Sequence, residues 1–187
     1  MPGQIKIDDG AGNYTILTNG GSLGSDKTIT IPNTTGTMAL TSDSFGKVLQ
    51  VVEGTYSTAT SNTTTSYADT NLTASITPSA ITSKILVIVK HNVQLSRTAT
   101  EVDGGIQLLR DATQISFSYM YQSIGGATSV IWRNIPVMLS LDSPSTTSSV
   151  TYKTQAKLFG STSGSHTITT SNFDVTDTII LIEVDGS

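Results

Sequence analysis

One stretch of the chain, residues 83–95, is apolar on both faces of the strand that it predicts. Successive side chains of a strand point to opposite faces. One face therefore carries Ile85, Val87 and Val89. The other face carries Leu86 and Ile88. A strand with two apolar faces is covered on both sides. We expect one cover to be the partner sheet of a sandwich, and the other to be more of this chain or a neighbouring copy of it.

Several further apolar pieces follow Gly46, each bounded by Ser, Thr, Gly, Asp or Pro clusters that are typical of turns. Together with the first stretch they predict strands at residues 47–56, 71–77, 84–95, 105–110, 114–121, 129–141, 149–159 and 178–184. No window shows helical periodicity with caps. Short polar breaks at residues 110–113 and 141–149 indicate antiparallel hairpins. The pattern predicts an all-β chain folded as an antiparallel β-sandwich, with the eight-stranded jelly roll as its specific form.

Period-two alternation also predicts which face of each strand points inward. In 114–121 the expected inner set is Ile115, Phe117, Tyr119 and Tyr121. In 135–141 the expected inner set is Ile135, Val137, Leu139 and Leu141, opposite Pro136, Met138 and Ser140.

The last predicted strand, TIILIEV, resembles residues 83–95 in having two apolar faces, so it also needs cover on both sides. A sandwich covers only one face of each sheet, and permanent subunit contacts resemble a core cut in half. We therefore expect a trimer interface built from Ile180, Ile182, Val184, Leu86 and Ile88. The alternative is that the N-terminal segment folds back over these residues.

Residues 1–44 consist of short extended pieces punctuated by Gly, Asn and Asp, namely QIKID, NYTILT, KTITIP and GTMAL. None has enough apolar surface to fold alone. We expect two parts: an extended attachment and assembly segment at 1–44 and a β-sandwich domain at 45–187.

Two parts of the sequence are similar to a known protein family. The run KTITIPNTTGTMALTSD, residues 27–43, resembles a segment near the start of many bacteriophage fibre and virion structural proteins, notably those of marine phages. Residues 47–89 and 104–115 resemble the same family. The resemblance implies a non-enzymatic virion protein, usually a homotrimer, with no catalytic residues to transfer. The strand order also resembles the C1q and TNF-like jelly roll, in which the C-terminal strand lies near the three-fold axis.

Composition narrows the range of partners. Of the 187 residues only 13% are charged, and the net charge of -4 disfavours nucleic acid, whose binding needs clustered Lys and Arg. Cysteine is absent, which excludes disulfides and thiolate chemistry. No run approaches the roughly 18 apolar residues of a membrane span, so we expect no membrane insertion.

Candidate chemistry is sparse. His91 and His166 have no metal-site spacing, and His91 on an apolar strand face is expected to be a hydrogen-bonded core or interface residue. No nucleophile-elbow motif is present, and we expect no catalytic residue, no metal and no cofactor. Aromatic side chains suggest one recognition surface, a host glycan or receptor site near Trp132, Asn134 and Tyr121.

These observations lead to a hypothesis: a trimeric phage tail fibre, head fibre or capsid decoration, located in the virion. Residues 1–44 would attach to other virion proteins, and the sandwich would serve host or surface adhesion. Two alternatives remain, a C1q-like ligand- or carbohydrate-binding module and a small polysaccharide hydrolase.

Overall fold

A computed structural model of the chain describes residues 5–8, 14–17, 48–160, 165–172 and 175–186. The chain divides into two compact units, residues 1–41 and 42–187. In the first unit β1 (Ile5–Asp8) and β2 (Tyr14–Leu17) form an antiparallel hairpin. The predicted extended pieces at 27–32 and 36–40 lie outside the described residues.

One layer of the second unit consists of two four-stranded sheets with the orders β11-β6-β14-β3 and β10-β7-β13-β4. Its strands are β3 (Val48–Tyr56), β4 (Thr60–Asn62), β6 (Lys84–Lys90), β7 (Val93–Arg97), β10 (Val130–Asn134), β11 (Val137–Asp142), β13 (Thr167–Thr170) and β14 (Asp177–Val184). Each strand of one sheet is the neighbour in sequence of the strand that holds the same position in the other sheet. The pairs are β10 and β11, β6 and β7, β13 and β14, and β3 and β4. The two sheets are therefore halves of one layer, interrupted at positions such as 91–92 and 135–136.

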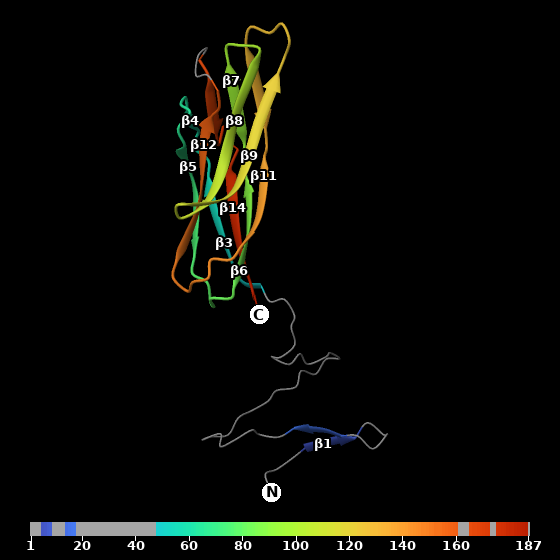
Figure 1. Ribbon diagram of the computed structural model, residues 1–187. Helices are drawn as coiled ribbons and strands as arrows, with labels where there is room; N and C mark the ends of the chain where they lie inside the picture. Colours follow the sequence, from blue (N-terminus) through green and yellow to red (C-terminus); the bar gives the residue numbers. More distant parts are fainter. Residues whose placement is uncertain (1–4, 9–13, 18–47, 161–164, 173–174, 187) are drawn as a thin grey trace. The chain divides into compact units, whose positions relative to one another are not determined.

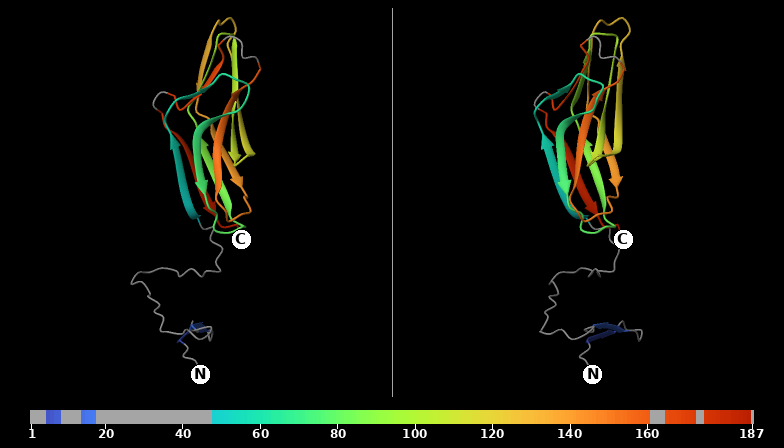
Figure 2. Two further views of the ribbon diagram at one scale, coloured as in Figure 1. Left: turned by 90° about the vertical axis from the view of Figure 1, so that its left-hand side faces the viewer. Right: turned by 60° about the vertical axis from the view of Figure 1, so that its left-hand side comes forward.

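The opposite layer is a four-stranded sheet in the order β5-β12-β8-β9, formed by β5 (Ala68–Ile76), β8 (Glu101–Arg110), β9 (Thr113–Ser123) and β12 (Val150–Leu158). Figures 1 and 2 show the two layers face to face. All strand pairs in the described residues are antiparallel, and no helix occurs among them. The predicted β-sandwich is thus confirmed, and the distribution of strands between the layers is that of a jelly roll.

The core lies between the layers. The predicted inner face of residues 83–95 is confirmed, because Ile85, Val87 and Val89 are 0% exposed and Val93 and Leu95 continue the same buried row. The opposite layer contributes residues such as Leu72, Ile106, Leu108, Tyr152 and Leu158.

Two predicted inner faces are wrong. In β11 and the residues before it, Pro136 and Met138 are buried, whereas Ile135, Val137, Leu139 and Leu141 are 57–64% exposed. In β9 the residue that reaches the core is Met120, whereas Phe117, Tyr119 and Tyr121 are exposed. Ile115 is half-buried beside a register shift between β8 and β9. In both strands the more apolar face is the outer one, so periodicity alone selected the wrong side.

Candidate interaction surface

The outer face of the β11-β6-β14-β3 sheet is lined by apolar side chains in register. Residues paired directly across neighbouring strands share a face. One row runs from Leu139 through Ile88 and Ile180 to the exposed Glu53 at the sheet edge. The next runs from Leu141 through Leu86 and Ile182 to Val51. We call the apolar residues of these rows, with their neighbours on the same side, the apolar face: Val51, Leu86, Ile88, Val137, Leu139, Leu141, Ile180, Ile182 and Val184.

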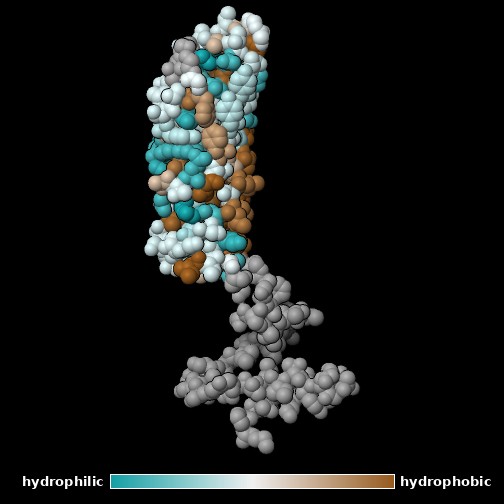
Figure 3. Space-filling model, viewed as in Figure 1, coloured by the Kyte–Doolittle hydropathy of each residue, from teal (hydrophilic) through white to brown (hydrophobic). Residues whose placement is uncertain are grey.

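Exposure within the apolar face follows the position of each strand in the sheet. The flanking residues Val51, Val137, Leu139 and Leu141 are 58–64% exposed, whereas the side chains on the central strands β6 and β14 are half-buried between them. Figure 3 shows hydrophobic residues gathered along the right-hand border of the body, where Figure 1 draws β11. Contiguous apolar surface of this kind marks interaction sites on soluble proteins.

The apolar face stops where the strands break. Beyond the break, one outer row of the β10-β7-β13-β4 sheet runs from Arg133 through Gln94 and Thr169 to Ser61. Arg133 Nε donates to Gln94 Oε1 at 3.1 Å, and the hydroxyls of Ser61 and Thr169 are 2.9 Å apart. One layer therefore has an apolar half and a half rich in hydroxyl and amide groups, in which Ile131 on β10 is an exposed apolar residue.

All five residues expected in a trimer interface, Ile180, Ile182, Val184, Leu86 and Ile88, lie on the apolar face. The recognition residues are not gathered in this way. Tyr121 lies on the outer face of β9, and its hydroxyl donates to Glu101 Oε2 at 3.1 Å. Trp132 is half-buried against the core on the inner side of β10, and Asn134 Oδ1 accepts from the Ile135 backbone N–H at 2.9 Å.

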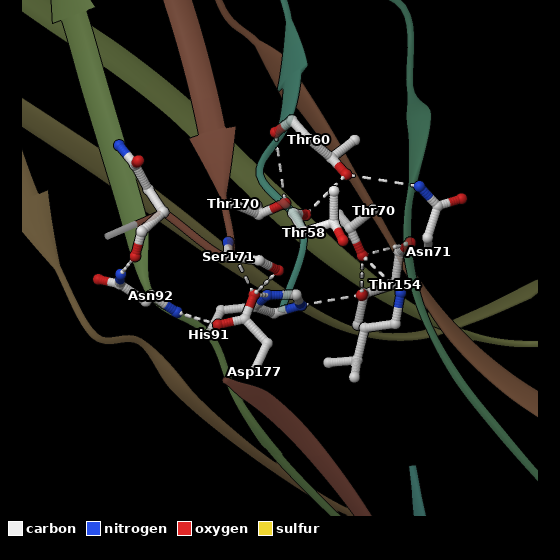
Figure 4. Close-up of polar contacts among 12 residues, drawn as sticks. Thr58, Thr60, Thr70, Asn71, His91, Asn92, Thr154, Thr170, Ser171 and Asp177 are labelled. Carbon is white, nitrogen blue, oxygen red and sulfur yellow. Dashed lines mark hydrogen bonds and ion pairs between the residues drawn. The ribbon is translucent and has the colours of Figure 1, made fainter. Parts of the chain in front are cut away.

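A buried polar network fills the break between β6 and β7 (Figure 4). His91 Nδ1 lies 2.6 Å from Asp177 Oδ2, and both side chains are 0% exposed. The Asn92 backbone N–H donates to Asp177 Oδ1 at 2.6 Å. The backbone N–H and the hydroxyl of Ser171 donate to Oδ2 at 3.0 and 2.8 Å. The carboxylate of Asp177 thus accepts from the Asn92 backbone N–H at the break, and it shares the Ser171 backbone N–H with the Asn92 carbonyl oxygen, which lies 3.1 Å from that nitrogen.

The network crosses to the opposite layer through a threonine. His91 Nε2 lies 2.8 Å from Thr154 Oγ1 on β12, which lies 2.5 Å from Thr70 Oγ1 on β5. A hydroxyl, an imidazole and a carboxylate in this sequence are the parts of a hydrolytic relay. Thr154 is 0% exposed, however, and its hydroxyl is enclosed by Thr70 and His91. The arrangement therefore serves as a link between the layers, and the expectation of His91 as a hydrogen-bonded core residue is confirmed.

Two further ionisable groups are held inside the body. His166 is 1% exposed, and its Nε2 lies 3.7 Å from Asp103 Oδ1. Glu183 is 0% exposed and accepts from the Ser79 backbone N–H at 2.6 Å and from Gln50 Nε2 at 2.5 Å. Burial alone would raise the pKa of Glu183, but the hydrogen bonds from Gln50 and Ser79 hold it below the ordinary value.

Within the described residues no three His, Cys, Asp or Glu side chains are grouped as a metal site would require. The same part of the chain contains no helix long and apolar enough to cross a membrane. A scan against protein-family models finds no match for the chain, and a search of curated proteins finds none either.

Proposed function

We propose that this chain is a non-enzymatic structural protein of a phage virion, a homotrimeric fibre, spike or capsid decoration. Residues 1–44 attach it to other virion proteins, and the β-sandwich is displayed for adhesion. The observation that carries the proposal is the apolar face of β11-β6-β14-β3. The resemblance of residues 27–43 and 47–89 to phage fibre proteins supplies the virion setting.

Burial of the apolar face provides the driving force for assembly. Each of its flanking side chains is 58–64% exposed, and burying the remainder of one Val or Leu contributes about 1–2 kcal/mol. Closed symmetric homo-oligomers are the usual outcome when one chain supplies all the subunits. The resemblance to the C1q-like jelly roll, in which the C-terminal strand lies near the three-fold axis, leads us to place the axis beside β14.

The first test measures mass by light scattering. A trimer has three times the chain mass of 19.6 kDa, and Leu139→Lys is expected to yield monomers because it places a charge on the apolar face, at a side chain that is 64% exposed in the single chain. Ile81→Lys is the matched control, because Ile81 is 65% exposed outside the apolar face. A parent protein of single-chain mass, or an equal effect of the two variants, would contradict the trimer. A single-chain mass with the face shielded by residues 1–44 would favour the folded-back segment.

The second test addresses the virion setting. Purified particles of the phage that encodes the chain are analysed by mass spectrometry and labelled with antibody against the β-sandwich. We expect the protein in the particles at a fixed copy number, on the head or the tail. Its absence from intact particles would refute a virion role while leaving the trimer untouched.

A further inference from the structure

The opposite layer of the sandwich has a column of exposed aromatic side chains on its outer face. Phe117, Tyr119 and Tyr121 follow one another on β9 at alternate positions and are 39%, 55% and 49% exposed. Phe159 lies beside the column, with ring centroids 5.8 Å from Phe117 and 5.3 Å from Tyr119 in edge-to-face contact. Gly105, the residue paired with Tyr119, leaves the room that these rings occupy, because a Cβ there would lie 2.7 Å from Phe117 and 2.8 Å from Phe159.

A row of polar side chains runs across the sheet from this column. Gln107, which pairs with Phe117, donates through Nε2 to Gln155 Oε1 at 2.7 Å. Gln155 Nε2 in turn donates to Asp69 Oδ1 at 2.7 Å, which lowers the pKa of that carboxyl. Gln107 is itself buried, at 6% exposed, and it orients the half-buried Gln155 amide, which in turn orients the exposed Asp69 carboxylate on the outer face of the sheet.

The row ends at a hollow of about 180 Å³ at the edge of the sheet. β5 and β12 lose register between Lys153 and Gln155, and Asn71 has a φ of 66° there, so the two strands part locally. The hollow is lined by Asp69, Asn71, Leu72, Thr73, Lys153 and Thr154. Carboxylate, amide, hydroxyl and ammonium groups thus surround a space smaller than the roughly 300–1,000 Å³ of a drug-sized pocket.

We infer that this outer face binds a neutral oligosaccharide, with sugar rings stacked on Phe117, Tyr119 and Tyr121 and a terminal sugar in the hollow beside Asp69 and Lys153. The inference rests on the proposed function, since it names the ligand that the displayed body takes. Aromatic rings with a few oriented polar groups fit a ligand that has apolar ring faces and hydroxyl edges. The column lies on β9 and the hollow beside β5, three strand spacings apart in the sheet. At about 4.8 Å for each spacing they are about 14 Å apart, so a ligand that reaches both must contain more than one sugar.

The charges on this face favour a neutral ligand over an acidic one. Lys153 Nζ lies 3.1 Å from Asp69 Oδ1, and Lys157 Nζ lies 4.5 and 4.6 Å from the ring centroids of Tyr67 and Phe159. Both ammonium groups already have partners on the protein. An acidic sugar would also meet the carboxylates of Asp69 and Glu101.

The experiment is isothermal titration of the full chain with cello-, malto- and chito-oligosaccharides and, for comparison, oligogalacturonate. We expect at least one neutral ligand to bind, and oligogalacturonate not to bind. Tyr119→Ala is expected to weaken binding about tenfold, because it removes a stacking ring. Asp69→Asn is expected to weaken binding several-fold, because it removes the charge of the carboxylate while keeping the shape of the side chain. Ser75→Ala is the matched control, because Ser75 is exposed on the same face of β5 outside the hollow.

Light scattering on the same samples separates this inference from the proposed trimer. No heat of binding at about 10 mM of every neutral ligand would overturn the inference, because a site with a Kd of about 1 mM would then be mostly occupied. Equal weakening by Ser75→Ala, or preference for oligogalacturonate, would also overturn it. Dissociation of the assembly by Tyr119→Ala would assign the aromatic column to a subunit contact instead. A monomer that binds the oligosaccharide would refute the trimer alone.

Discussion

The buried network of His91, Asp177 and Thr154 predicts a large and specific loss of stability when its carboxylate is removed. Asp177 accepts hydrogen bonds from the Asn92 backbone and from the backbone and hydroxyl of Ser171, and it contacts His91. In Asp177→Ala the Asn92 backbone N–H, the Ser171 hydroxyl and His91 Nδ1 lose this partner, at about 1–3 kcal/mol for each unsatisfied group, whereas the Ser171 backbone N–H keeps its bond to the Asn92 carbonyl oxygen. Allowing for relaxation, we expect a loss of about 3–5 kcal/mol, the usual result of removing one member of a buried pair. Domains of this kind have a total stability of about 5–15 kcal/mol.

A finer version of the experiment changes one hydroxyl at a time. Thr154→Val keeps the shape of the side chain but removes the oxygen that joins His91 to Thr70, so we expect a loss of about 1–3 kcal/mol in urea unfolding. Thr151→Val is the matched control on the same strand, because the Thr151 hydroxyl lies on the outer face, 2.8 Å from Ser75 Oγ. Its expected effect is within about 0.5 kcal/mol. Equal effects of the two variants would refute the assignment of the network as the link between the layers.

Two further predictions concern stability. The pKa of Glu183 is lower in the folded protein than its ordinary value of 4.5, so the carboxylate stabilises the fold above that pH, and this contribution is lost as the pH falls through the folded pKa. Urea unfolding of Glu183→Gln should depend less on pH in this acidic range than that of the parent, and identical pH profiles would contradict the assignment. Gly54→Ala should destabilise the fold more than Gly105→Ala, since the new methyl meets the Thr73 backbone carbonyl in the first case and movable rings in the second. We expect about 1–3 kcal/mol for Gly105→Ala, and an equal or smaller loss for Gly54→Ala in thermal unfolding would argue against this packing.

The sequence identified the fold through strands whose strongest apolar face is the inner one. In β6 both faces are apolar, and the face with three apolar residues, Ile85, Val87 and Val89, is the one that lies in the core. In β11 the same rule failed, because Leu139 and Leu141 are more apolar than the inward-facing Pro136 and Ser140. The strands β4 and β13, with the sequences TSN and TITT, were missed, because short Thr-rich pieces resemble turns.

The candidate sites were predictable to different degrees. The second apolar faces of residues 84–90 and 178–184 were visible because these strands carry apolar residues at both odd and even positions, so five members of the apolar face could be named. Leu139 and Leu141 were assigned to the core, and only the register of β11 against β6 places them outside. The pairing of His91 with Asp177, 86 residues apart, depends on tertiary contacts that no local pattern encodes.

The break across the first layer makes the two ends of the body chemically different. Val48 begins β3 and pairs with Val184 at the end of the apolar half that is farthest from the break. The first described residue of the β-sandwich and the apolar half of the layer therefore lie at the same end of the body. In the proposed trimer the subunits would contact one another at that end, while the hydroxyl-rich ends carrying β10-β7-β13-β4 would be farther apart. In the proposed trimer such a geometry would present separate ends to a surface and would set the spacing at which several weak contacts can be made at once.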